Sequence, residues 1–269
     1  MPLWIVATPI GTLSDCSPRA QRILSEATLI AAEDTRVTRR LLHALSIEAT
    51  KVVSLRAKNE KHYVPALLSE AENGNLVYVC DAGTPCISDP GAYLVEQAIE
   101  AGIRILSVPG PSSLSTALAA SGFVANPSYF AGFAPKKGRE NWLLDLLQRP
   151  ETLVVFEAPT RVEDLVRRCA GIAPEREASL CRELSKRHEE IIRGRFSELT
   201  EVLDAHSSLK GEMVLVIGPG DKPRLVPQIV SLEGDSLKDI SKVLSVRWNV
   251  SKREAYQQLL ALGKQYEEQ

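Results

Sequence analysis

The sequence predicts an α/β protein built on a mainly parallel sheet. Short apolar runs alternate with helical patterns through the first half of the chain, and three of these runs end in Pro, Gly and hydroxyl residues. This alternation is typical of parallel strands joined by right-handed helical crossovers. Beyond about residue 150, neighbouring apolar runs lack a helix between them, which indicates an antiparallel element and a second, mixed α/β region.

Five strands are predicted in the first half, each as an apolar run that ends in turn residues. They are residues 3–8, 29–36, 51–55, 76–80 and 103–108. Ser17 followed by Pro18 is typical of a helix start. Later helices are expected to carry Leu41 and Leu42, then Leu67 and Leu68.

The segment after the fourth run, "DAGTPCISDPG", is predicted to end in another helix start. Asp89 precedes Pro90, so Asp89 is expected to cap this helix and Gly102 to end it. The expected buried stripe of the helix is Leu94, Val95, Ala98 and Ile99. A further helix of small residues, "LSTALAASG", follows the fifth run.

The second half begins where the composition changes, at residues 132–141. Strands are predicted at 152–159, 178–184, 189–196 and 212–220, with helices from Thr160 and from Ser197. Residues 221–235 read as a linker, before two helices at about 236–248 and 251–263. The predicted domains are therefore 1–130, 131–220 and a helix-turn-helix-like tail over 221–269.

Composition excludes several classes of protein. The chain has 269 residues, 44% hydrophobic and 25% charged, which is ordinary globular composition. A net charge of −2 argues against nucleic-acid binding by the whole surface, so such contacts must come from local basic sites. Five cysteines without a C-x-x-C pair argue against a zinc site or a disulfide framework and for the reducing cytoplasm. No transmembrane helix or signal peptide is expected.

Three strand ends share one kind of loop, which predicts a ligand site. They are "TPIG" at 8–11, "DAGTP" at 81–85 and "PGPSS" at 109–113. The carboxyl ends of parallel strands meet at one edge of a sheet, where α/β proteins bind ligands. Gly83 and Gly110 allow a ligand to approach the backbone, and a helix cap at Ser112 or Ser113 would present amides to a carboxylate. The absence of G-x-G-x-x-G and Walker A motifs favours a small ligand with carboxylate, amine and ribose groups.

Two clusters of ionisable residues are candidates for chemistry. In "AEDTRVTRR", at 32–40, an acidic helix start is the alternative, and it is preferred for Arg39 and Arg40. In "CRELSKRHEE", at 181–190, a solvated hairpin is an equal alternative. "PKKGR" at 135–139 is a candidate phosphate site, although a solvated linker is preferred. Phe130, Phe133 and Trp142 near it would either stack on bases or lie in the core.

The motifs occur in an order that resembles a known family. They are "LWIVATPIGTLSD", "AAEDTRVTRRLL", "DAGTPCISDPG", "VPGPSSLSTALAASG", "FEAPTR", "RELSKRHEE" and "KGEMVLVIG". The chain resembles the bacterial ribosomal RNA small-subunit methyltransferase I family of the tetrapyrrole methylase superfamily, from residue 3 to 218 and into the tail. The resemblance implies a two-domain class III methyltransferase fold with a C-terminal helical extension, a cytoplasmic homodimer, and S-adenosylmethionine bound in the cleft between the domains.

The implied reaction is methyl transfer to the ribose 2′-hydroxyl of a decoding-centre cytidine of 16S rRNA in the small ribosomal subunit. Lys186 or Glu183 would orient or deprotonate the hydroxyl, while Asp34 and Arg36 would position the nucleotide. The cofactor-binding residues implied by the motifs are Pro9, Gly11, Asp81, Gly83, Thr84, Ser88, Pro109, Gly110, Ser112 and Ser113. No metal ligands are expected. The chain departs from the family pattern at Thr12, Lys58, Thr160 and Ser185, all expected at the rim of the site.

Two other functions stay open at this point. The superfamily also contains enzymes that methylate a tetrapyrrole carbon, of precorrin type, with the same fold and cofactor. The basic "PKKGR", "SKRHEE" and tail segments favour RNA over such a small molecule. A non-catalytic RNA-binding protein on the same fold is the second alternative, and the three intact loops argue against it.

Overall fold

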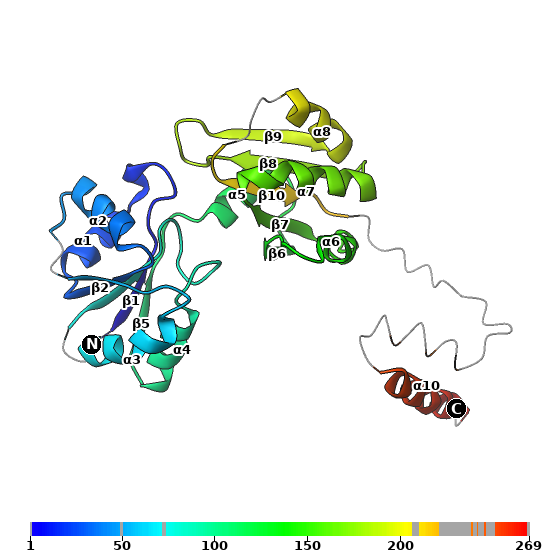
Figure 1. The fold of residues 1–269 in the computed structure, drawn as a ribbon, viewed down its shortest axis with the longest axis horizontal. Helices are drawn as coiled ribbons and strands as arrows, with labels where there is room; N and C mark the ends of the chain where they lie inside the picture. The colour runs from blue at the N-terminus through cyan, green and yellow to red at the C-terminus, as the bar shows by residue number, and fades with distance from the viewer. Residues whose placement is uncertain are drawn as a thin grey trace. The chain divides into compact units, whose positions relative to one another are not determined.

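The computed structural model describes residues 2–48, 51–71, 74–205, 210–220, 238, 241, 245 and 251–267. They belong to two compact units, Met1–Lys222 and Pro223–Gln269. The first unit contains two five-stranded sheets (Figure 1). The predicted division of this part of the chain at residue 130 stays a prediction.

The first sheet is parallel throughout, as the sequence predicts. Its strands are β1 (Leu3–Val6), β2 (Leu29–Ala32), β3 (Val52–Ser54), β4 (Leu76–Val79) and β5 (Ile105–Val108). They lie in the order β3-β2-β4-β1-β5, so β4 and β1 occupy the centre. All five carboxyl ends therefore point to the same edge.

Helices cover both faces of this sheet because strand side chains alternate in direction. The helices are α1 (Pro18–Ser25), α2 (Thr35–Ala44), α3 (Glu60–Ala71) and α4 (Ala92–Glu100), with a 3₁₀ turn, η1, at Leu13–Asp15. Val77 and Val79 of β4 lie in one core cluster with residues of α1 and α2. Leu76 and Tyr78 of the same strand lie in another, with residues of α3 and α4. The predicted cap of α1 is confirmed, since the Ser17 hydroxyl accepts a hydrogen bond from the Ala20 amide.

The predicted capping of α4 by Asp89 is wrong. The helix begins one residue after Gly91, which adopts a left-handed conformation at φ 116°. Its first-turn amides donate to a residue of α3 instead: Glu60 Oε1 accepts from Gly91 at 3.0 Å and from Leu94 at 3.1 Å. Ile99, expected in the buried stripe, is 64% exposed.

The second sheet is mixed, which confirms the predicted antiparallel element. Its strands are β6 (Ser128–Phe133), β7 (Thr152–Glu157), β8 (Glu177–Arg182), β9 (Glu190–Arg195) and β10 (Met213–Ile217). They lie in the order β6-β7-β10-β8-β9, and only the β6–β7 pair is parallel. Strand β6 was not predicted from the sequence.

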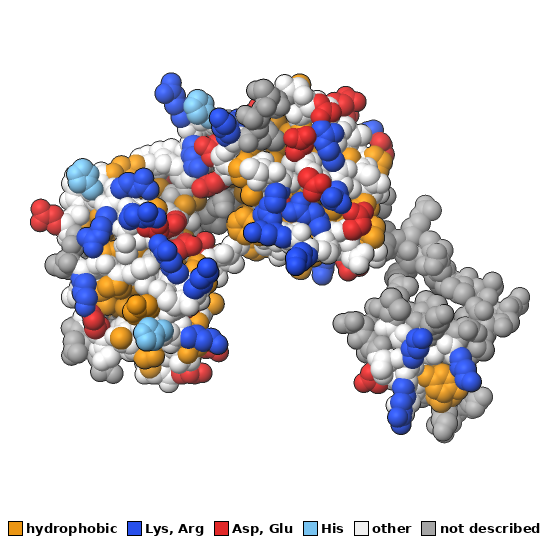
Figure 2. All heavy atoms as spheres, in the orientation of Figure 1, with side chains coloured by type: hydrophobic (Ala, Val, Ile, Leu, Met, Phe, Trp, Pro, Cys, Tyr) orange, Lys and Arg blue, Asp and Glu red, His pale blue; other side chains and the backbone are white. Residues whose placement is uncertain are grey.

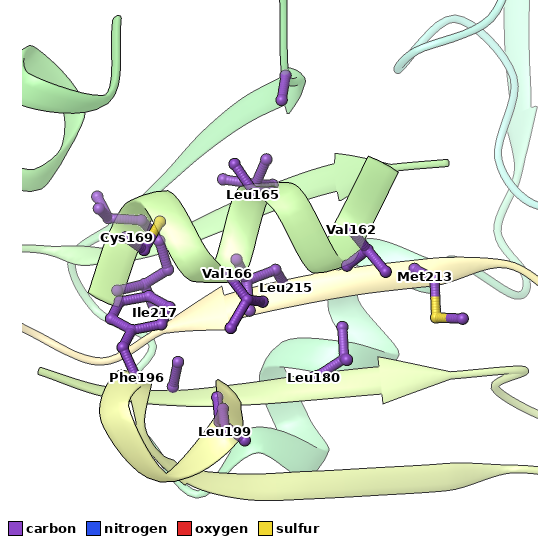
Figure 3. Packing of buried hydrophobic residues seen from close by; sticks show 14 of the residues in the cluster. Val162, Leu165, Val166, Cys169, Leu180, Phe196, Leu199, Met213, Leu215 and Ile217 are labelled. Atoms are coloured by element: carbon purple, nitrogen blue, oxygen red, sulfur yellow. The ribbon is translucent and has the colours of Figure 1, made fainter. Parts of the chain in front are cut away.

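One face of the second sheet is covered by α6 (Arg139–Leu147), α7 (Pro159–Ile172) and α8 (Phe196–Ala205). Figure 3 shows Val162, Leu165 and Val166 of α7 above Leu215 of β10, with Phe196 of α8 nearby. The opposite face is covered by α5 (Ser113–Ser121), the helix that leaves the first sheet. Its Ala117 shares a core cluster with residues of β7 and β10.

The preferred interpretation of residues 135–139 as a solvated linker is wrong at Arg139. This residue begins α6, and its side chain is largely buried. Its guanidinium donates to the fully buried carboxylate of Glu157 at 2.7 Å and to Asp164 at 3.0 Å. Arg161 pairs with the same Glu157 carboxylate at 2.6 Å. Two arginines therefore stabilise one buried carboxylate at the end of β7.

The second unit is described only in part. Helix α10 (Lys252–Glu267) confirms the predicted helix at 251–263 and extends it. The predicted linker at 221–235, and the predicted helix at 236–248 apart from three of its residues, lie outside the described residues. Among the described helices, none combines the length and the apolar character that a bilayer crossing requires.

Replacing Glu60 tests the cap that the sequence did not reveal. We expect Glu60→Ala to lower the free energy of unfolding by about 1–3 kcal/mol, because two buried amides lose a charged acceptor. Glu60→Gln, which keeps one acceptor oxygen, is expected to cost less. Urea unfolding followed by circular dichroism measures both. A larger loss for Asp89→Ala than for Glu60→Ala would return the capping role to Asp89.

Candidate active site

Loops at the carboxyl edge of the first sheet are tied to one another. Thr8 and Gly83 exchange backbone hydrogen bonds at 2.9 and 3.0 Å, which joins the loop after β1 to the loop after β4. The Thr84 hydroxyl donates to the Pro111 carbonyl at 3.0 Å and so joins the loop after β5. Gly83 has φ 82°, a conformation that favours glycine. The predicted grouping of the three loops is confirmed.

A cavity of about 380 Å³ lies between this edge and the second sheet. The first sheet's loops and the start of α5 line one wall with Glu33, Asp81, Ala82, Gly83, Thr84, Ile87, Ser88, Asp89, Ser112, Ser113 and Leu114. The second sheet lines the other with Phe133, Phe156, Glu157, Ala158, Pro159, Gly211, Glu212, Met213 and Val214. Its size is typical of a small-molecule site.

Three carboxyl groups in the cavity have raised pKa values. Burial is the main cause for each of Glu33, Asp81 and Asp89. Repulsion from Asp81 raises the pKa of both Glu33 and Asp89 further. Asp81 also accepts a hydrogen bond from the Asp34 amide at 3.0 Å. Clustered, half-buried carboxylates favour a ligand that carries positive charge or hydrogen-bond donors.

The opposite wall supplies aromatic surface. Phe133 and Phe156 meet edge to face, with ring centroids 5.5 Å apart, and Phe133 is 55% exposed. Phe130 also meets Phe156 edge to face, with ring centroids 4.8 Å apart. Of the three aromatics noted in the sequence, Phe133 therefore lines the cavity, while Phe130 and Trp142 pack against the core.

Glu183 and Lys186 lie behind the second wall and do not line the cavity. Glu183 Oε1 accepts from Lys186 Nζ at 2.9 Å and from the Glu212 amide at 2.8 Å. Lys186 Nζ is also 3.4 Å from Glu212 Oε2. A Cβ added at Gly211 would lie 2.3 Å from the Glu183 carboxyl carbon, so only glycine allows this approach. Glu183 and Lys186 therefore contact two residues that line the cavity, Gly211 and Glu212.

The charges of this pair are fixed by each other. The Lys186 ammonium hydrogen bond holds the pKa of Glu183 below its ordinary value. Burial lowers the pKa of Lys186, but the hydrogen bond to Glu183 and the charges of Glu212 and Glu183 outweigh it and raise the pKa. Glu183 is therefore a carboxylate and Lys186 an ammonium at neutral pH. Both Glu183 and Ser185 adopt positive φ, at 50° and 61°, which is unusual for residues with side chains.

The loop after β1 contacts the turn that contains Lys186. The Thr12 hydroxyl donates to the Ser185 carbonyl at 2.5 Å, and the Thr12 amide donates to the Ser185 hydroxyl at 3.2 Å. The Ser185 hydroxyl donates in turn to Asp15. A Cβ at Gly11 would lie 2.5 Å from the Ser185 carbonyl oxygen. The structure thus brings together Thr12 and Ser185, two residues that the sequence places at the rim of the site, in one contact.

Asp34 and Arg36 line a second cavity of about 500 Å³, which shares Glu33 and Asp81 with the first. Arg36 donates to both Asp34 oxygens, at 3.1 and 2.6 Å, and holds the pKa of Asp34 well below its usual range. Asp34 also caps α2 by accepting from the Arg36 amide. Asp34 therefore both caps α2 and lines the second cavity.

The predicted site residues fall into four groups. Asp81, Gly83, Thr84, Ser88, Ser112 and Ser113 line the first cavity. Pro9, Gly11, Pro109 and Gly110 belong to the same loops without lining it; a Cβ at Gly110 would lie 2.9 Å from Cβ of Ala7. Lys186 and Glu183 lie behind the cavity, and Asp34 and Arg36 beside it. Their functional roles stay predictions.

Sequence reasoning missed most of the second wall and the place of Asp89. Phe156, Glu157 and the stretch 211–214 were not assigned to the site, although "FEAPTR" and "KGEMVLVIG" contain them. The available signal was that Glu157 ends a strand, as Asp81 follows one. Within the described ranges, His, Cys, Asp and Glu side chains form no group of three or more that could hold a metal ion.

Comparison with known proteins agrees with this geometry. A family model described as Tetrapyrrole (Corrin/Porphyrin) Methylases matches residues 2–200. Proteins named Ribosomal RNA small subunit methyltransferase I are similar over most of their length. The one from Mycobacterium tuberculosis is 41% identical, covering 96% of this chain and 94% of the relative. The one from Bacillus subtilis is 36% identical, covering 94% and 92%.

A relative of the same name from Xylella fastidiosa is 44% identical over 80% of both chains. Among solved structures, uroporphyrin-III-C-methyltransferase from Thermus thermophilus matches with a TM-score of 0.57 at 20% identity, covering 87% of this chain and 97% of that one. The similarity to this solved structure concerns the fold alone. The fold class predicted from the sequence is confirmed.

Two glycine substitutions test the contact between the loop after β1 and the 183–186 turn. We expect Gly11→Ala to push the loops apart, since the added methyl group meets backbone at 2.5 Å, and to reduce ligand affinity at the cavity at least ten-fold. Gly171→Ala in α7 meets no atom within 4 Å and is expected to be neutral or slightly stabilising. Calorimetric titration with S-adenosylmethionine and thermal unfolding measure both variants. Equal behaviour of the two would show that this contact does not shape the cavity.

Proposed function

The chain belongs to the tetrapyrrole methylase family, among the ribosomal RNA small subunit methyltransferase I proteins, and from this premise we propose that it methylates 16S rRNA. In this proposal the methyl group of S-adenosylmethionine is transferred to the ribose 2′-hydroxyl of a decoding-centre cytidine. The observation that carries it is the cavity between the sheets, with half-buried carboxyls on one wall and aromatic side chains on the other.

The residues present fit this methyl donor. Its sulfonium and ammonium groups are cationic, which suits Glu33, Asp81 and Asp89. Its adenine suits the exposed ring of Phe133. Its carboxylate suits the amino end of α5, where Ser112 occupies the cap position without a side-chain capping bond. The bound donor supplies an electrophilic methyl carbon attached to a good leaving group.

The chain's own residues then have to align a hydroxyl with that methyl carbon. The donor would supply the methyl carbon and keep the electron pair of the broken S–C bond, while the protein would hold the hydroxyl in line with that carbon and let its proton pass to solvent. Lys186 as an ammonium and Glu183 as a carboxylate of lowered pKa do not line the cavity, so they would position the substrate through Glu212 rather than deprotonate it. Asp34 and Arg36, in the adjoining cavity, position the nucleotide. We further propose that the enzyme is a cytoplasmic homodimer, as its family resemblance implies.

Transfer of labelled methyl to small ribosomal subunits that lack the modification tests the proposal. We expect label on a single ribose of 16S rRNA, mapped by resistance to alkaline cleavage. In the same assay, Lys186→Ala and Glu183→Gln are expected to lower kcat by roughly ten-fold or more while the affinity for S-adenosylmethionine stays within two-fold.

Three results would contradict parts of this proposal. Unlabelled subunits and free rRNA, with donor binding intact, would favour a tetrapyrrole carbon as the acceptor. Failure to bind the donor would favour a non-catalytic RNA-binding protein. An unchanged kcat in both variants would remove Lys186 and Glu183 from the reaction.

Donor affinity is expected to depend on pH through the three raised carboxyl pKa values. Below these raised values the groups are neutral and attract a cation less, so affinity falls as pH decreases through the range just above the ordinary carboxyl pKa of about 4. For the ligand-free protein the sign is opposite. The folded state holds these protons more tightly than the unfolded state, so their contribution to stability falls as pH rises through the same window.

Calorimetric titration across this pH range measures the effect. S-adenosylhomocysteine, which lacks the sulfonium charge, is the matched ligand and is expected to show a weaker dependence. Asp89→Asn is expected to flatten the curve for the donor. Identical pH profiles for the two ligands would show that the three carboxyl groups do not recognise the sulfonium charge.

A further inference from the structure

The second cavity contains more positive charge than the two residues assigned to it from the sequence. Its lining residues are Glu33, Asp34, Arg36, Arg56, Ala57 and Lys58, completed by Asp81 and Pro90. Arg56 and Lys58 come from the segment between β3 and α3, whereas Arg36 belongs to α2. Cationic side chains from two separate elements therefore meet around one hollow.

Arg56 is held in place from the protein side. Its Nε donates to the Glu33 carbonyl at 3.2 Å, and its amide donates to the Asn59 side chain at 2.7 Å. Nη2 is 3.6 Å from Asp34 Oδ2. The side chain is nevertheless 56% exposed, so the guanidinium is oriented yet accessible. Such a preorganised fork is suited to phosphate oxygens.

Lys58 adds a second accessible charge. Its side chain is exposed and forms no ion pair with any residue in the described part of the chain. Lys51, which directly precedes β3 in the chain, differs because it forms an ion pair with Glu70 at 2.7 Å.

The floor of the cavity has the opposite character. The Asp34 side chain is only 16% exposed, and its charge is compensated by Arg36 at 2.6 Å. Glu33 and Asp81 form the wall shared with the donor cavity. Carboxyl groups accept hydrogen bonds from hydroxyls, so the wall of Glu33 and Asp81 suits a sugar. The cationic rim suits an anion.

We infer that the second cavity holds one ribonucleotide of the RNA strand. The phosphate lies against Arg56, Lys58 and Arg36 at the rim, and the ribose 2′-hydroxyl faces Glu33 and Asp81. The inference rests on the proposed function, because it places the ribose on the wall next to the methyl donor. A nucleotide within an RNA strand carries both groups that this cavity suits, an anionic phosphate and a free 2′-hydroxyl on the same sugar.

The charge distribution favours a local phosphate site over a broad basic surface. The chain carries a net charge of −2. Figure 2 shows Asp and Glu side chains among the Lys and Arg side chains on the face that it displays. RNA contact through a few placed cations is consistent with this surface.

Salt dependence of methyl transfer separates a phosphate contact from other roles. We expect Arg56→Gln and Lys58→Ala to raise KM for small ribosomal subunits by roughly five- to twenty-fold at low salt, with kcat changed less. Each lost phosphate contact should also reduce the slope of log KM against log salt by about 0.7–0.9 over about 50–300 mM KCl. Lys51→Ala removes one exposed charge near the same strand and is expected to match the parent enzyme.

The outcomes distinguish this inference from the proposed function. A parent enzyme that labels no subunits defeats the proposed function and, with it, the inference. If the parent enzyme labels subunits but Lys58→Ala and Arg56→Gln keep its KM and salt slope, only the ribonucleotide site is overturned. A fall in kcat at unchanged KM and slope would equally overturn it. Loss of affinity for S-adenosylmethionine in Lys58→Ala would assign the residue to the donor instead.

Discussion

The backbone pairing of Thr8 with Gly83 is the constraint on which the site depends. It joins the loops that leave the two central strands, β1 and β4, and the Thr84 hydroxyl adds the loop after β5. A parallel sheet brings these loops to one edge, but only hydrogen bonds between them fix their relative positions. Gly83 permits the pairing because its positive φ would strain another residue. The loops that carry the carboxyl wall of the cavity are therefore joined to one another by hydrogen bonds without a ligand.

Much of the first sheet followed from periodicity, whereas the cap of α4 did not. Asp89 and Pro90 have the local pattern of a helix start, but the amides of the first turn pair with Glu60, which lies 31 residues before Gly91. Local sequence cannot reveal a capping group supplied by another helix. The place of Arg139 was not predicted for a similar reason. Arg139 begins α6, whereas its partner Glu157 is the last residue of β7. In both cases the partner is a carboxylate distant in the sequence, where a local helix cap and a solvated linker had been predicted.

The candidate site was predictable on one side only. Asp81, Thr84 and Ser112 follow strands of one parallel sheet, so their convergence required no knowledge of tertiary packing. Phe133 and Gly211 come from a different sheet, and their approach depends on how the two sheets meet. That meeting depends in part on the contact between Thr12 and Ser185, two positions that no sequence pattern connects.

The position of α5 has a consequence for biosynthesis. This helix leaves the first sheet, yet its apolar face packs on β7 and β10 of the second sheet (Figure 1). On the ribosome the first sheet emerges complete while α5 still lacks its partners, and β10 is the last strand of this unit to be made. The nascent chain must therefore keep that face from misassociating until Met213–Ile217 has been translated. Helix α5 therefore couples the folding of the two sheets, because it is synthesised before the strands on which it packs.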